Sequence, residues 1–202
     1  MRLDLHQAAE ALKLGRIVAI PTETFFGLAV DCHQNQAIEA IFQLKSRPHT
    51  APLPLLVPSQ QHVRALLSSP PDRLHLSFMQ KFWPGKLTLI LPHAKPSLSP
   101  LVRSRAHVAV RHDGHPELCA LLNTTRLTLT GTSANLTGHP PLTRGQDVSN
   151  LFASHPLYAG HLSDATTIGG FASTILDLTK HPPEIAREGE LSATLRCDFD
   201  IP

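Results

Sequence analysis

Small polar and cationic side chains gather where apolar runs of this sequence begin or end. The run "LTGTSANLTGHPP" (129–141) combines hydroxyl and amide side chains with two glycines, and "KSRP" (45–48) places two cations two positions apart. Small residues allow backbone amides to approach an oxyanion closely, while Lys and Arg neutralise phosphate charge, Arg through a two-pronged fork. These residue types in this arrangement favour binding of an anionic, phosphate-bearing ligand.

Three further polar segments stand at the ends of apolar runs: "PTETFFGL" (21–28), "VRHDGHP" (110–116) and "STILDLT" (173–179). In open α/β sheets, ligands bind in a crevice at the strand ends, so all five segments are expected to meet around one pocket. Each segment taken alone has a plainer explanation, since a solvated helix end, a capped turn or an exposed strand residue uses the same residue types.

Several other kinds of site are not indicated. The sequence contains no Walker lysine loop, no Rossmann glycine fingerprint and no nucleophile elbow. His112 and His115 have the H-x-x-H spacing, but the intervening Asp-Gly indicates a turn, so no metal site is predicted. The three cysteines, at 32, 119 and 197, form no C-x-x-C pair, which fits reduced thiols and a cytoplasmic location.

Length and composition indicate one globular domain. The chain has 202 residues, of which 42% are hydrophobic and 17% charged, with a net charge of +2. This mild positive balance permits a nucleotide or nucleic-acid partner without requiring one. No apolar run reaches the length of a membrane span, so no membrane partner is expected, and the first residues resemble an amphipathic helix rather than a signal peptide.

Helical and strand patterns alternate along most of the chain. Apolar periodicity and capping residues predict helices at 4–14, 35–45, 60–67, 72–83, 115–123 and 144–152. Short apolar runs predict strands at 16–21, 25–31, 53–58, 87–91, 107–111, 126–134, 156–160, 173–178 and 184–188. The pattern predicts one α/β (α+β) domain, residues 1–195, with a twisted mixed sheet flanked by helices and a concave cationic pocket. Residues 196–202 are expected to form a loosely attached tail.

Taken in order, several segments resemble the YrdC-like family of threonylcarbamoyl-AMP synthases. They are "PTETFFGL", "KSRP" followed by "PLPLLV", "WPGKLTLIL", "VAVRHDGHP", "TSANLTGHPP", "STILDLT" and "REGE". The resemblance covers about residues 8–192 and is to the short, single-domain form. It implies a YrdC-like fold and a nucleotidyltransferase that converts L-threonine, bicarbonate and ATP into L-threonylcarbamoyladenylate and pyrophosphate. The product would serve the N6-threonylcarbamoyladenosine modification of tRNA.

The resemblance also assigns roles to residues. It implies that Lys45 and Arg47 are catalytic and contact the phosphates of the substrate ATP. The other implied ATP-binding residues are Thr132, Ser133, Asn135, Ser173 and Arg187, and the implied threonine-binding residues are Thr22, Thr24, Arg111 and Thr174. The reaction requires positioning and charge neutralisation rather than a covalent nucleophile, and Mg²⁺ is expected to assist the departure of pyrophosphate. Expected macromolecular partners are tRNA and the downstream threonylcarbamoyl transferase proteins.

Three alternatives stay open at this point. Phe26, Ala51 and Ala172 depart from residues common in the family, which allows a paralogue with an altered substrate. An RNA-binding module for tRNA or double-stranded RNA would use the same cations, although the near-neutral charge and the lack of interleaved aromatic and basic residues weigh against it. A carbamoyl-transfer domain like that of hydrogenase maturation proteins is the third, but the chain has no room for their acylphosphatase and zinc-finger segments.

Overall fold

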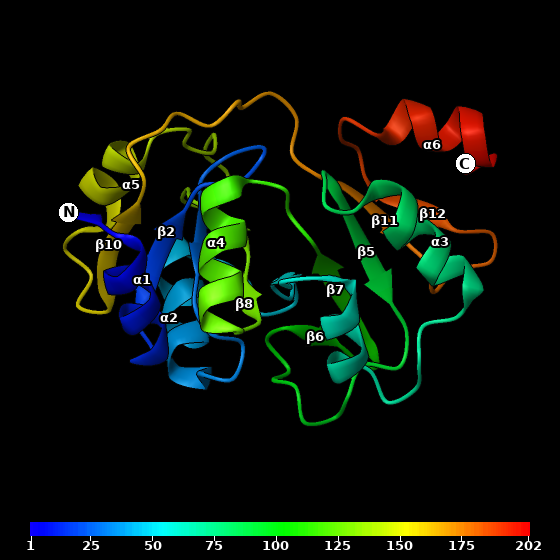
Figure 1. The fold of residues 1–202 in the computed structure, drawn as a ribbon, viewed down its shortest axis with the longest axis horizontal. Helices are drawn as coiled ribbons and strands as arrows, with labels where there is room; N and C mark the ends of the chain where they lie inside the picture. The colour runs from blue at the N-terminus through cyan, green and yellow to red at the C-terminus, as the bar shows by residue number, and fades with distance from the viewer.

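Two mixed β-sheets lie side by side in the computed structural model, which describes all of residues 1–202 (Figure 1). The five-stranded sheet has the order β1 (Arg2–Leu3), β10 (Tyr158–Leu162), β2 (Ile17–Ile20), β3 (Gly27–Ala29) and β9 (Thr132–Ser133). The seven-stranded sheet has the order β12 (Glu184–Arg187), β11 (Thr174–Asp177), β5 (Leu87–Leu91), β7 (His107–Arg111), β4 (Leu55–Leu56) and β8 (Leu129–Thr130), with β6 (Arg103–Ser104) paired to β7. The mixed α/β class is confirmed, with the strands divided between two sheets.

Helices cover these sheets largely where the apolar periodicity predicts them. They are α1 (Leu5–Lys13), α2 (Asn35–Lys45), a 3-10 helix (Gln60–Leu66), α3 (Arg73–Phe82), α4 (Pro116–Thr125), α5 (Gly145–Phe152) and α6 (Ser192–Phe199). Asp4 caps α1, since its Oδ1 accepts a hydrogen bond from Gln7 N at 2.8 Å. Helix α2 ends at Lys45 as predicted, and Lys45 Nζ donates a hydrogen bond to Ser133 O on the edge strand β9.

The predicted strand at 126–134 is broken at Gly131. Its first half, β8, pairs with β4 in the seven-stranded sheet, whereas its second half, β9, pairs with β3 in the other sheet. A Cβ atom on Gly131 would lie only 2.7 Å from Leu56 Cδ1, so the absence of a side chain lets the chain pass closely over Leu56. The polar segment 131–135 therefore crosses the seam between the two sheets, by which we mean the line where their neighbouring edges meet.

The C-terminal residues are better attached than the sequence suggested. Helix α6 runs through the expected boundary at residue 195, and Leu195 and Ile201 are buried. The Phe199 ring lies 5.0 Å from the Phe78 ring and 5.7 Å from the Phe82 ring, both on α3 (centroid distances). The expectation of a loosely attached tail is wrong because these apolar side chains pack against α3.

One hydrophobic core serves both sheets. A cluster of 36 buried residues includes Ile17 and Leu28 from the five-stranded sheet together with Leu89 and Val110 from the seven-stranded sheet. A second cluster of 14 buried residues includes apolar side chains of α1 and α4. The shared core holds the seam in a fixed geometry. No helix combines the length and apolar character needed to cross a membrane.

Candidate functional site

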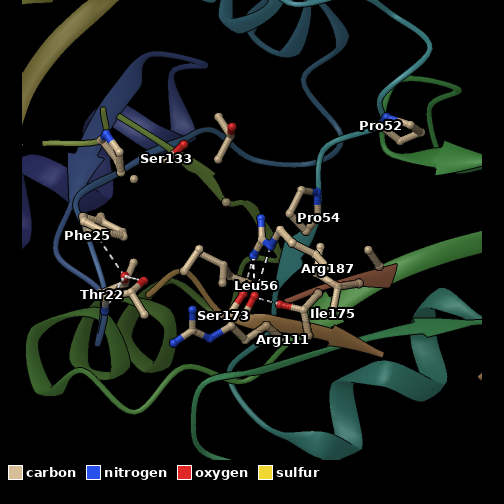
Figure 2. Close-up of a pocket in the computed structure, with 18 of the residues that line it drawn as sticks. Thr22, Phe25, Pro52, Pro54, Leu56, Arg111, Ser133, Ser173, Ile175 and Arg187 are labelled. Atoms are coloured by element: carbon tan, nitrogen blue, oxygen red, sulfur yellow. Dashed lines mark hydrogen bonds between the residues drawn. The ribbon is translucent and has the colours of Figure 1, made fainter. Parts of the chain in front are cut away.

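A cavity of about 330 Å³ opens at the seam, and both sheets contribute to its lining (Figure 2). All five polar segments singled out in the sequence reach it or lie directly behind it. Eight of the predicted site residues line it, namely Thr22, Thr24, Arg47, Arg111, Thr132, Ser133, Ser173 and Arg187. The other three, Lys45, Asn135 and Thr174, are not part of the lining. The sequence thus predicted the convergence of the segments, and the structure separates wall residues from supporting ones.

Three arginines line the cavity, and no aspartate or glutamate does. Burial lowers the pKa of Arg47 and, together with the neighbouring charges of Arg111 and Arg47, lowers the pKa of Arg187. These guanidinium groups are therefore close enough to repel one another. A hollow with low-dielectric walls focuses such a field, so the cavity attracts anions.

Arg47 and Arg187 form no ion pair with a carboxylate. Arg47 Nε donates to Ala51 O at 2.9 Å, and Arg47 Nη2 lies 3.4 Å from Pro52 O. Arg187 donates through Nε and Nη2 to Ser173 O at 3.1 and 2.7 Å, and through Nη2 to Ser173 Oγ at 2.8 Å, as the dashed lines in Figure 2 show. Carbonyl and hydroxyl partners orient both guanidinium groups without neutralising them. Both can therefore contribute their full charge to a bound phosphate.

Lys45 is buried behind the cavity wall rather than exposed in it. Its Nζ donates to Ser133 O at 2.5 Å, to Asn135 O at 2.6 Å and to Asn135 Oδ1 at 2.9 Å. Burial, and secondly the charge of Arg47, lower the pKa of Lys45 to about 7. The lysine at the end of α2 thus holds segment 133–135, which supplies Ser133 to the wall.

Asn135 completes this support. Its Oδ1 also accepts a hydrogen bond from Ser133 Oγ at 2.7 Å, and its Nδ2 donates to His139 O at 2.5 Å. Every polar atom of the Asn135 side chain is therefore used within the chain. Thr174 is also committed, because it is fully buried and its Oγ1 accepts a hydrogen bond from Leu191 N at 3.0 Å.

Hydroxyl groups line two sides of the cavity. Thr22 Oγ1 donates to Phe25 O at 2.7 Å and lies 3.1 Å from Thr24 Oγ1, in the loop that follows β2. Ser173 directly precedes β11, and its Oγ lies 2.9 Å from Thr88 Oγ1 on β5. Thr88 also lines the cavity, although it was not predicted from the sequence. A single threonine within the apolar strand β5 gives no local indication that it faces a cavity.

Arg111, the third arginine, is paired with two carboxylates. Its Nε donates to Gly85 O at 2.8 Å, while its Nη2 lies 2.6 Å from Asp113 Oδ2 and 3.3 Å from Glu23 Oε2. Burial raises the pKa of the Asp113 carboxyl, and the charge of Arg111 opposes that rise. Neither carboxylate was predicted from the sequence as part of the site, although they stand inside the segments "PTET" and "RHDG". Their proximity to Arg111 depends on the tertiary fold.

The chain is similar to known proteins over most of its length. A model of the Sua5/YciO/YrdC family, described as "Telomere recombination", matches residues 10–189. A threonylcarbamoyl-AMP synthase of Bacillus subtilis is 33% identical over 190 residues, which are 94% of this chain and 54% of that protein. A threonylcarbamoyl-AMP synthase of Pyrococcus abyssi is 31% identical over 184 residues, 91% of this chain and 53% of that protein. The chain thus spans about half the length of these two relatives.

The fold is also similar to that of solved structures. The crystal structure of Pyrococcus abyssi Sua5 complexed with L-threonine superposes with a TM-score of 0.85 at 27% identity, covering 100% of this chain and 62% of that one. Escherichia coli YciO superposes with a TM-score of 0.82 at 18% identity, covering 95% of this chain and 97% of that one, which shows a shared fold.

Proposed function

We propose that this chain, which belongs to the Sua5/YciO/YrdC family, is an L-threonylcarbamoyladenylate synthase. It would convert L-threonine, bicarbonate and ATP into L-threonylcarbamoyladenylate and pyrophosphate. The observation that carries the proposal is one cavity in which three arginines and several hydroxyl groups converge without a lining carboxylate. Such a lining suits a polyanion, and the reaction joins two anions.

The phosphate end of the cavity, by which we mean the part lined by Arg47 and Arg187, carries positive charge that no carboxylate neutralises. Arg47 and Arg187 would contact the triphosphate, and Thr132, Ser133 and Ser173 would supply hydroxyl groups to it. Lys45 would act through Asn135 and Ser133 in the conformation described here, by fixing the wall that faces the nucleotide. These assignments follow from charge, exposure to the cavity and the resemblance to the family.

The threonine end is defined by Thr22, Thr24 and Arg111, with Thr174 behind the neighbouring wall. Arg111 would bind the α-carboxylate of L-threonine, because guanidinium groups bind carboxylates through paired hydrogen bonds. The complex of Pyrococcus abyssi Sua5 with L-threonine supports an amino-acid subsite in this fold. The two hydroxyl groups of the loop after β2 are suitable partners for a polar amino acid.

The chemistry needs only positioning and charge stabilisation. The amine of threonine and bicarbonate first form a carbamate with loss of one water molecule. A carbamate oxygen then attacks the α-phosphorus, a new P–O bond forms, and the bond to the leaving pyrophosphate breaks. Arg47 and Arg187 would stabilise the charge that accumulates on the phosphate oxygens. Mg²⁺ prefers oxygen ligands, and the cavity lining offers no carboxylate, so the ion would be held by the phosphates of ATP.

We place the product upstream of tRNA modification. A carbamoyl group activated as a mixed anhydride with AMP must be consumed by a transferase that passes it to an amine. The proposed partners are therefore tRNA and a downstream threonylcarbamoyl transferase, in the cytoplasm. A paralogue with an altered amino-acid substrate would keep the phosphate end and differ at the threonine end.

Pyrophosphate release provides the test. Purified protein with ATP should release pyrophosphate only when both L-threonine and bicarbonate are present. Arg111→Ala should raise KM for threonine at least about tenfold and change KM for ATP less, because a charge-assisted hydrogen bond is lost at the amino-acid end. Release that ignores threonine would contradict the proposal. Salt-dependent RNA binding without any pyrophosphate release would favour the RNA-binding alternative.

A further inference from the structure

Arg111, Asp113 and Glu23 form a charged cluster at the threonine end of the cavity. Arg111 lines the cavity, whereas Asp113 and Glu23 are not among its lining residues. In Figure 2 the Arg111 guanidinium group points toward the side of the cavity where Thr22 lies, away from Arg187. One cation faces two carboxylates, so the cluster has a formal net charge of −1 when both carboxylates are ionised.

Asp113 is the fixed member of this cluster. Its side chain is 0% exposed, and its Oδ2 lies 2.6 Å from Arg111 Nη2. Its other oxygen, Oδ1, accepts hydrogen bonds from Glu23 N at 3.2 Å and from His115 N at 2.9 Å. Asp113 therefore ties the end of β7 to the loop that carries Thr22 and Thr24. Its Oδ2 holds Arg111 as an ion pair that lacks hydrogen-bond geometry.

Glu23 is the looser member. Its side chain is 27% exposed, and its Oε2 lies 3.3 Å from Arg111 Nη2. The same oxygen accepts a hydrogen bond from Gly114 N at 2.9 Å, and a Cβ atom at Gly114 would lie only 2.9 Å from Glu23 Oε1. The glycine makes room for this carboxylate, which would keep the Gly114 amide as a partner if it lost Arg111.

These contrasts assign different roles to the two carboxylates. We propose that Asp113 is the fixed counter-ion that aims Arg111 into the cavity, and that Glu23 is a competing carboxylate which the carboxylate of an amino-acid substrate displaces from Arg111. A third carboxylate beside this cluster would be repelled unless one of the first two withdraws. This inference deepens the proposed function and rests on it. Both carboxylates are positioning residues, since neither faces the substrate directly.

The two roles predict opposite effects of two isosteric substitutions. Asp113→Asn keeps an oxygen for the two backbone N–H groups, but it then presents an NH₂ group to Arg111, so the guanidinium group must move. Glu23→Gln keeps an oxygen for Gly114 N–H and removes the charge that competes for Arg111. A purely structural role for both side chains would leave substrate affinity unchanged in both variants, because both retain their backbone hydrogen bonds.

Calorimetric binding of L-threonine, with L-threoninol as the matched ligand that lacks the carboxylate, tests the proposal. Asp113→Asn should weaken L-threonine binding about tenfold or more, the effect expected when a charge-assisted hydrogen bond is misaligned. Glu23→Gln should tighten L-threonine binding severalfold and leave L-threoninol binding unchanged. The control is Glu184→Gln, which removes one charge from an exposed position on β12 and should behave as wild type.

The outcomes separate the two proposals. The roles of Asp113 and Glu23 are overturned if Asp113→Asn binds L-threonine like wild type, if Glu23→Gln weakens that binding, or if wild type does not bind L-threonine. Should Asp113→Asn fail to fold, Glu23→Gln decides alone, because only a competing carboxylate predicts tighter binding of the carboxylate-bearing ligand. Threonine binding with the predicted pattern but without pyrophosphate release would overturn the proposed function and leave the cluster's role intact.

Discussion

Three oxygen atoms surround the Lys45 ammonium group, and this arrangement makes a buried cation the support of segment 133–135. The ammonium form supplies three protons for three acceptors, whereas the neutral amine could donate only two. The sequence predicted that the segments carrying Lys45, Ser133 and Asn135 meet, and the contacts of Lys45 with Ser133 and Asn135 confirm it. It did not predict that the Lys45 ammonium group donates its hydrogen bonds to carbonyl oxygens of the protein. The burial of Lys45 depends on distant parts of the fold.

The ionisation of Lys45 is directly measurable. NMR of carbon-13-labelled lysine side chains should show one residue, absent from Lys45→Met, that titrates with a midpoint near 7, since burial lowers its pKa to about 7 from 10.5. The folded state then binds fewer protons than the unfolded state between these values. The free energy of unfolding of wild type, relative to Lys45→Met, should therefore rise with pH from about 7 to about 10. A midpoint near that of an exposed lysine would contradict the assigned burial.

Substitution of Arg47 tests most directly the proposal that this part of the cavity binds the phosphates of ATP. Arg47→Ala should raise KM for ATP or lower kcat so that kcat/KM falls about a hundredfold, because the variant loses an uncompensated charge that we propose contacts the phosphates. The protein should stay folded, since Arg47 donates only to the carbonyl groups of the loop at Ala51 and Pro52. Arg73→Ala, at an exposed position on α3, is the matched control. Near-normal kcat/KM in Arg47→Ala would relocate the phosphate site.

At the scale of elements, the sequence predicted those features that depend on residues close together in the chain. The start of α1 after Asp4 and the end of α2 at Lys45 are set by neighbours in sequence, and the helices predicted at 4–14 and 35–45 are confirmed. The break at Gly131 and the packing of α6 were missed. Both depend on contacts with distant residues, with Leu56 in the first case and with α3 in the second.

Gly131→Ala tests the crossing between the sheets. The added Cβ would lie 2.7 Å from Leu56 Cδ1, so either the segment or Leu56 must move. We expect a loss of about 1–3 kcal/mol in the free energy of unfolding, typical of overpacking. In a Leu56→Ala background the same substitution should cost much less, measured by urea denaturation in a double-mutant cycle. Additive effects would show that Leu56 is not the obstacle.

At the scale of the whole molecule, the seam between the sheets is what creates the site. Polar segments separated widely in sequence meet there because one core holds both sheets. The sequence predicted the convergence from the general behaviour of α/β sheets. It could not predict which residues face the cavity, since Lys45, Asn135 and Thr174 carry the same residue types as the lining but lie behind it.

We infer from the shared core that residues 1–202 form one cooperative unit, α6 included. Thermal unfolding should then show a single transition with coincident midpoints by circular dichroism and by fluorescence of Trp83, the sole tryptophan. Trp83 is a suitable probe because it is buried and its Nε1 donates to Leu87 O on β5 at 2.7 Å. Two separated midpoints would indicate that the sheets unfold independently.

The central claim is that this cavity joins threonine, bicarbonate and the α-phosphate of ATP, and mass spectrometry of the nucleotide product tests it most directly. With carbon-13 bicarbonate, wild-type protein should form a threonylcarbamoyl adenylate that carries the label, and Arg47→Ala should form far less. If ATP, threonine and bicarbonate yield no labelled adenylate, or if the Arg47→Ala variant produces as much as wild type, the account of the site is contradicted.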